Sequence, residues 1–196
     1  MRTKVRKQLH STFKVLMAGR LPRFVPLADP VAGPAELMWS ATLRPKLTFF
    51  LYLTALENQD VFTVELGWSD DGTFPWQNDS FKFENVEVPK GRARLSCLWT
   101  VDGRDRGWAV VPVQTSEQLR AKLDAMSRGD WETVQQIRKS LEVSPEEAAR
   151  RVPPLANDGF ERIVHYGLPL FRRIARAHGI EWNPEFDDLG NMGTRR

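Results

Sequence analysis

The chain has 196 residues, of which 41% are hydrophobic and 27% charged, and its formal net charge is +3. A chain of this length buries roughly 70% of the surface that its unfolded form exposes, so it needs neither a disulfide nor a structural metal. Its longest apolar stretch, from Leu47 to Leu56, is too short to span a bilayer, and a single cysteine excludes an internal disulfide. We therefore expect a cytoplasmic protein with no membrane association.

The N-terminal segment is basic, because seven cations precede the first carboxylate, Asp29. Apolar residues recur there at helical spacing and predict an amphipathic helix over residues 3–18 that packs on a sheet with its cations facing water. The residues of this stripe are Val5, Leu9, Phe13, Leu16 and Met17. A basic helix can also be an arm for nucleic acid or a targeting segment, and both alternatives stay open.

A meander of three strands is predicted next. Prolines at positions 22, 26, 30 and 34 keep the preceding connector extended. Alternation of apolar and polar residues then predicts strands over 36–44 and 61–69, each with one face buried. Between them, residues 47–56 are apolar on both faces, as is typical of a strand in the middle of a sheet.

The segment from 69 to 92 contains turn residues, including Lys90-Gly91, and we expect a loop with little regular structure. Alternation resumes at Leu95, with Cys97 expected to point into the core, and predicts a strand over 94–101. Asp102-Gly103 is a hairpin signal, and a strand over 107–112 follows it. The sheet is therefore expected to be antiparallel with about five strands.

The C-terminal half is predicted to be helical, with helices over 116–128, 131–142, 145–151 and 159–178. Capping residues mark each start, and Pro153-Pro154 is expected to end the third helix. Gly167 and Pro169 are expected to kink the last one. The first helix carries Leu119, Leu123 and Met126 after its capping box, and the second is expected to bury Trp131, Val134, Ile137 and Leu141. The fold class is thus α+β, with a single domain over 1–182 and a flexible tail over 183–196.

Few residues suggest catalysis. The three histidines have none of the spacings that metal sites use, and no glycine-rich phosphate loop occurs, so we predict no metal and no cofactor. Glu161 and His165 are four residues apart and could form an acid/base pair of an enzyme or an ordinary pair on a helix surface. Cys97 could be a nucleophile, although a buried thiol is normally inert.

Two surfaces are candidates for binding a partner. Acidic and aromatic residues of one loop could form a protein-binding surface, or their aromatics could cover the sheet edge. These residues are Trp68, Asp70, Asp71, Phe74 and Trp76. Cations of the first and last helices could instead contact nucleic acid, or they could form solvated helix faces. These residues are Arg2, Lys4, Arg6, Lys7, Arg172, Arg173 and Arg176.

Three segments carry a resemblance to known proteins: FTVELGWS in the meander, WAVVPV at the end of the second hairpin and HYGLPLFRRIA in the last helix. Over about residues 3–178 the chain resembles a family of small uncharacterised bacterial α+β proteins, some of which look like immunity proteins of toxin systems. The resemblance implies a protein that occludes a protein partner rather than an enzyme. The chain departs from that family by a helical insertion between Thr115 and Val152. We therefore expect a protein-binding module, such as an immunity or accessory protein.

Overall fold

The structure is a computed structural model that describes residues 3–27, 37–43, 46–56, 61–76, 86–100, 107–110, 115–140 and 143–186. Arg2, Leu141, the expected Asp102-Gly103 turn and the expected tail beyond residue 186 lie outside these ranges. The described residues form a mixed α+β fold with an open antiparallel sheet, an N-terminal helix and C-terminal helices, as the sequence predicts. None of the described helices is long and apolar enough to cross a membrane.

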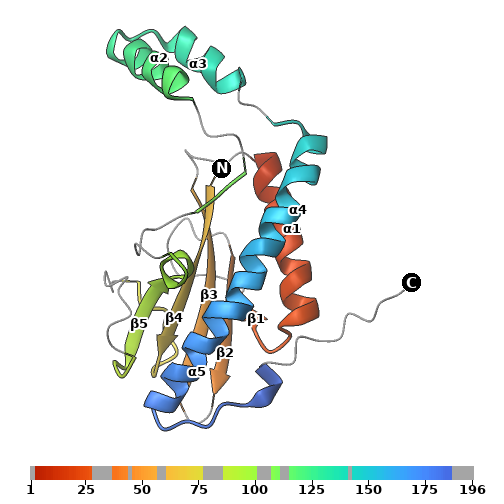
Figure 1. Ribbon diagram of the computed structural model, residues 1–196, viewed down its shortest axis with the longest axis vertical. Coiled ribbons are helices and arrows are strands. Elements are labelled where there is room, and N and C mark those ends of the chain that lie inside the picture. Colours follow the sequence, from red (N-terminus) through yellow and green to blue (C-terminus); the bar gives the residue numbers. More distant parts are fainter. Residues whose placement is uncertain are drawn as a thin grey trace, which may run out of the picture.

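The sheet has the strand order β1-β2-β3-β4-β5, with every pair antiparallel, and β6 pairs with the start of β4 (Figure 1). The predicted meander is confirmed in β2, β3 and β4. The strands are β1 (Val25–Pro26), β2 (Leu37–Leu43), β3 (Leu47–Leu56), β4 (Val61–Ser69), β5 (Lys90–Arg94) and β6 (Trp108–Ala109). The central strand β3 is buried on both faces because helices cover one face and a loop covers part of the other.

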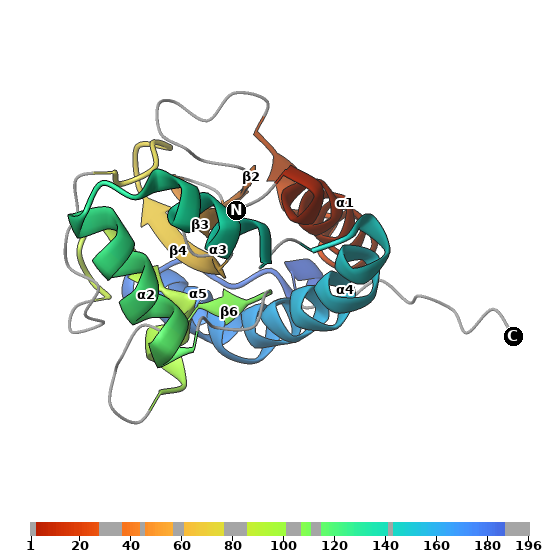
Figure 2. The same ribbon diagram turned by 90° about the horizontal axis from the view of Figure 1, so that it is seen from above.

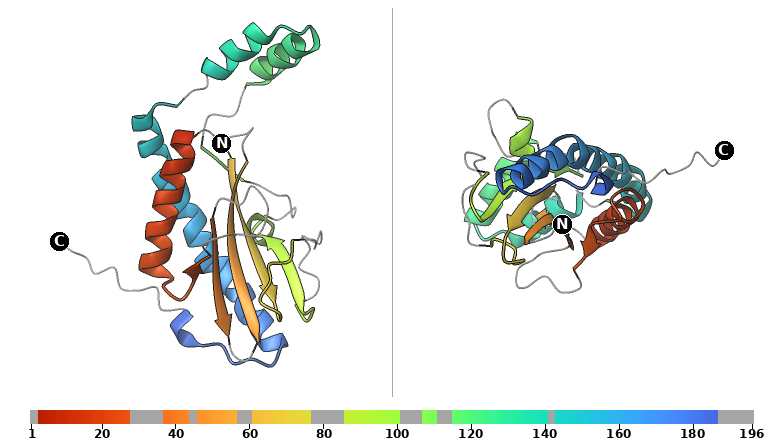
Figure 3. Two further views of the ribbon diagram at one scale, coloured as in Figure 1. Left: turned by 180° about the vertical axis from the view of Figure 1, so that it is seen from behind. Right: turned by 90° about the horizontal axis from the view of Figure 1, so that it is seen from below.

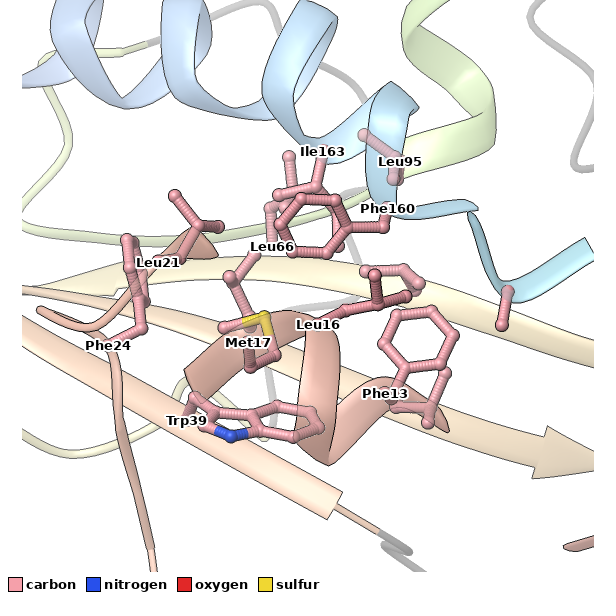
Figure 4. Close-up of a cluster of buried hydrophobic side chains, with 14 of the residues drawn as sticks. Phe13, Leu16, Met17, Leu21, Phe24, Trp39, Leu66, Leu95, Phe160 and Ile163 are labelled. Atoms are coloured by element: carbon pink, nitrogen blue, oxygen red, sulfur yellow. The ribbon is translucent and has the colours of Figure 1, made fainter. Parts of the chain in front are cut away.

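Helix α1 (Thr3–Arg20) and helix α4 (Pro145–Arg162) lie side by side on one face of the sheet (Figure 2). They run in the same direction, because the first turns of both lie together and so do their last turns. In addition to hydrogen bonds, the charge of Lys4 helps to lower the pKa of Glu146 at one end, and Arg20 forms an ion pair with Glu161 at the other. The predicted apolar stripe of α1 is buried. Figure 4 shows side chains from this stripe, from α4 and from Ile163 directly after it meeting over the sheet. The labelled ones include Phe13, Leu16, Met17, Trp39, Leu66, Phe160 and Ile163.

The expected break at Pro153-Pro154 is wrong, because α4 passes through both prolines. Val152 and Ala156 on either side of them are fully buried, whereas Pro154 is exposed, so packing of the inner face maintains the helix. A π-helical segment, η2 (Ile163–Gly167), then leads into α5 (Leu168–Ala177). The wider π turn lies just before Pro169, where an ordinary helix would lose a backbone hydrogen bond.

The predicted strand over 94–101 is also wrong. The strand of this region is β5, at 90–94, and residues 95–98 form a single 3₁₀ turn, η1 (Leu95–Leu98). Gly91 therefore lies in a strand and not in a turn. A Cβ atom at this position would lie 1.9 Å from Cζ2 of Trp68, so the glycine is needed for the close approach of the indole ring.

Two short helices, α2 (Ser116–Ser127) and α3 (Trp131–Ser140), form an antiparallel hairpin beyond the end of the sheet where α4 begins (Figures 1 and 3). The predicted capping box is present, with Thr115 and Gln118 exchanging side-chain and backbone hydrogen bonds at 3.0 and 3.1 Å. Gly129 has φ of +70°, which lets the chain turn between the helices. At the other end of the molecule, η3 (Pro184–Phe186) buries Phe186, so this part of the expected tail is packed.

Candidate protein-binding surface

The loop that the sequence singles out is only partly available to a partner. Trp68 and Phe74 are buried, with 3% and 8% of their surface exposed, and the Trp68 indole donates a hydrogen bond to the Val88 carbonyl at 3.1 Å. Asp70 and Asp71 are exposed and Trp76 is half-buried. Two of the five predicted contact residues are therefore core residues and offer little contact area.

Phe74 and Trp76 cover the face of the sheet that the helices leave open, which is toward the viewer in the left panel of Figure 3, whereas Trp68 belongs to the core under the helices. The centroid of the Phe74 ring lies 5.6 Å from that of Phe50 and 5.4 Å from that of Tyr52, and the Trp76 and Tyr52 ring centroids are 5.3 Å apart. Asp71 is held by Lys90 and Thr73, whose hydrogen bonds lower the pKa of its carboxyl. These contacts match the alternative in which the aromatics cover the sheet, on its face rather than its edge.

A buried carboxylate lies on the same face of the sheet. Glu65 in β4 is 6% exposed, and its oxygens lie 3.3 Å from Nε of Arg92 and 3.6 Å from Nε of Arg94 in the neighbouring β5. Burial raises the pKa of Glu65, while the two guanidinium groups act in the opposite direction. The three side chains connect β4 to β5, which is a structural role. Sequence reasoning missed them because it placed residue 92 in a loop.

The possible acid/base pair of an enzyme does not form. The Glu161 carboxylate pairs with Arg20, and the His165 ring Nδ1 lies 2.8 Å from the backbone oxygen of Glu161. Cys97 is half-buried in η1, so the expectation that it points fully into the core is wrong. In the part of the chain that the structure describes, no three His, Cys, Asp or Glu side chains gather closely enough to hold a metal ion.

The cations of the nucleic-acid alternative fall into two separate groups. The first turns of α1 lie at the end of the molecule where α4 begins, whereas α5 lies at the opposite end (Figure 1). Lys4 and Arg6 belong to the first group, and Arg172, Arg173 and Arg176 to the second. The guanidinium carbon of Arg172 lies 5.8 Å from the centroid of the Trp182 ring. The two groups therefore do not form one continuous cationic surface.

The α2–α3 hairpin exposes four large apolar residues, among them Trp131, whose expected burial is wrong, while the expected burial of Val134 is confirmed. The exposed fractions are 46% for Leu119, 56% for Leu123, 43% for Met126 and 61% for Trp131. The residues that the structure shows buried in the hairpin are Ala125 of α2 and Val134 of α3, which are 0% and 1% exposed. The capping signals were correct, but a stripe of apolar residues does not by itself say what it packs against.

The four exposed residues form one surface, which we call the hairpin patch. Spacings of four and three residues place Leu119, Leu123 and Met126 on one side of α2. Trp131 begins α3 directly after the turn, and ideal helix geometry places it on the same side of the antiparallel pair. Among the described residues eight large hydrophobic side chains are exposed, and these four belong to one hairpin of 25 residues, from 116 to 140. The others are Val15, Val25, Leu27 and Tyr166.

The hairpin patch offers a large apolar contact area, because Trp and Met side chains are large and these are exposed on a projecting helix pair. Comparison of the chain with known protein families, with curated proteins and with solved structures finds no match.

Proposed function

We propose that this protein is a protein-binding module and that it contacts its partner through the hairpin patch. The observation that supports this function is the exposure of three large apolar side chains in a row on α2, followed by Trp131. Moving one such side chain out of water is worth about 1.5–3 kcal/mol, so a partner that covers the patch gains substantial free energy. Contiguous apolar patches of this kind mark interaction sites.

The resemblance to bacterial immunity proteins extends the proposal to an immunity or accessory role in the cytoplasm, where the protein occludes its partner. The single cysteine, Cys97, suits a reducing compartment. An occluding protein needs a contact surface and not a reactive cleft, and the hairpin patch offers an apolar contact surface. Nucleic-acid binding is the less favoured alternative, because its cations lie at opposite ends of the fold.

The proposal is tested by a quantitative pull-down from native extract with tagged wild-type protein and a Leu123→Gln/Trp131→Gln double variant. Glutamine is a good helix former, so the substitution removes apolar contact area while leaving the helices intact. We expect a protein partner that the wild type recovers and the double variant loses. The matched control is Val15→Gln, which changes a residue of α1 that is 63% exposed and should leave recovery unchanged. Equal recovery by the double variant would contradict the proposal.

A further inference from the structure

The charged side chains of α2 are distributed unevenly around the hairpin patch. At about 100° per residue, Arg120 and Lys122 fall within about 90° of the centre of the stripe formed by Leu119, Leu123 and Met126, one on each side. The carboxylates of the same helix, Glu117 and Asp124, fall more than about 130° from that centre. The apolar stripe is thus flanked by cations, and the carboxylates face away from it.

We propose that the hairpin patch binds an acidic amphipathic helix of its protein partner, an inference that rests on the proposed function. A helix laid along α2 can insert its own apolar residues, at spacings of three and four, between Leu119, Leu123 and Met126. Carboxylates beside its apolar stripe then lie close to Arg120 and Lys122. These rim charges contribute to selectivity and association rate more than to total affinity.

The position of Lys122 argues against a second copy of the chain as the partner. Lys122 lies next to Leu123, near the middle of the stripe, so an antiparallel copy of α2 brings the two Lys122 ammonium groups to the same side of the interface. A parallel copy brings Lys122 of one chain to the same side of the interface as Arg120 of the other, so cation again lies beside cation. Like charges in both arrangements disfavour self-association, whereas an acidic partner pairs with both cations.

The composition of the hairpin argues against an anionic membrane surface. Residues 116–140 contain five Lys or Arg and four Asp or Glu, so the hairpin is nearly neutral. Helices that lie in a membrane interface usually have a polar face rich in Lys and Arg. The local cationic flanks of the stripe therefore match an acidic helix better than a lipid surface.

The test uses two fluorescently labelled synthetic peptides of roughly 18 residues, which is long enough for helix formation. Both carry Leu at the same positions with helical spacing, and the flanking positions are Glu in one peptide and Lys in the other. Binding to the full-length protein is followed by fluorescence anisotropy at low salt. We expect the Glu peptide to bind about tenfold more tightly than the Lys peptide, and this preference to shrink at high salt.

Charge-reversal variants show which residues of the protein cause the preference for the Glu peptide. In Arg120→Glu/Lys122→Glu the preference should disappear or reverse, whereas Leu123→Gln should weaken the binding of both peptides. The matched control is Arg128→Glu/Lys139→Glu, which makes the same change in charge at two exposed positions on other sides of the hairpin and should keep the preference.

Three outcomes would overturn the inference: no binding of either peptide, no preference for Glu, or binding to phosphatidylserine vesicles in place of the peptides. If the pull-down still depends on Leu123 and Trp131 in these cases, the proposed function stands and only the acidic helix is excluded. If the pull-down also shows no such dependence, both fail.

Discussion

At the scale of single residues, Glu65 links burial to pH. Burial raises the pKa of its carboxyl above the ordinary value of 4.5, despite the two neighbouring arginines. The folded chain therefore keeps this proton to a higher pH than the unfolded chain does. The contribution of Glu65 to stability is present at and below about pH 4.5 and is lost as the pH rises through the folded-state pKa.

We predict that the free energy of unfolding of the wild type, measured relative to Glu65→Gln, falls as the pH is raised from about 4 to about 7. The glutamine side chain has a similar shape and does not titrate, so the comparison cancels the contribution of the other ionisable groups. Urea unfolding followed by tryptophan fluorescence measures the difference. A difference that is constant, or that grows with pH, would contradict the pKa direction given above.

Gly91 makes a second prediction at this scale. Gly91→Ala should lower the free energy of unfolding by about 1–3 kcal/mol, because the added Cβ meets the Trp68 ring. The atoms in the way include Cζ2 and Cη2, which a phenylalanine ring lacks. In a Trp68→Phe background the same change should cost less, which a double-mutant cycle measures. An equal cost in both backgrounds would show that the indole is not the obstacle.

At the scale of elements, the prolines of α4 are the clearest conflict between local preference and packing. Pro154 lies in the helix interior and cannot donate a hydrogen bond to the carbonyl of Arg150. We expect Pro154→Ala to raise the free energy of unfolding by about 1–3 kcal/mol, reduced by the greater freedom of the unfolded chain. Chemical denaturation monitored by circular dichroism measures this gain. Pro145→Ala is the control, because proline is favourable in the first turn and no gain is expected.

The elements that the sequence predicts well are those whose pattern is self-contained. Period-two alternation located β2 and β4, and caps at Thr115 and Ser144 located the starts of α2 and α4. The errors arose where a distant contact decides the outcome. Gly91 reads as a turn residue until Trp68 is placed beside it, and Pro153-Pro154 reads as a helix end until the packing of α1 on α4 is known.

In the candidate site, too, local patterns could be predicted from the sequence and long-range contacts could not. The residues of the hairpin patch were identified from the sequence as apolar positions on two helices, with their spacing and caps correct. Their exposure could not be predicted, because an amphipathic pattern indicates a face that is covered in some state without identifying its cover. The loop with Trp68 and Phe74 was attractive for its composition, yet both side chains pack within the fold.

At the scale of the whole molecule, the fold has two parts with very different amounts of buried surface. The sheet, α1, α4 and α5 share one large apolar core, whereas α2 and α3 bury mainly Ala125 and Val134 between them. Little burial means that the hairpin can open locally without unfolding the core. The hairpin is therefore expected to be the less stable part of the described chain.

Hydrogen exchange followed by mass spectrometry tests this expectation. Amides of α2 and α3 should exchange faster than those of α1 and α4. Phe160→Leu, which weakens the core, should accelerate exchange in α1 and α4 while leaving the hairpin unchanged, because the hairpin opens independently. Equal protection of hairpin and core, or acceleration of both by Phe160→Leu, would indicate a single cooperative unit.

The position of α4 and α5 on the sheet has a consequence for synthesis. Strands β2 to β5 leave the ribosome before the helices that cover Phe49 and Leu66 have been made. At about 5–20 residues per second, the nascent chain carries an uncovered aromatic surface for on the order of 5–15 seconds. Newly made chains are thus most exposed to aggregation during this interval, and a chaperone that binds the emerging strands would act before the last helix closes the core.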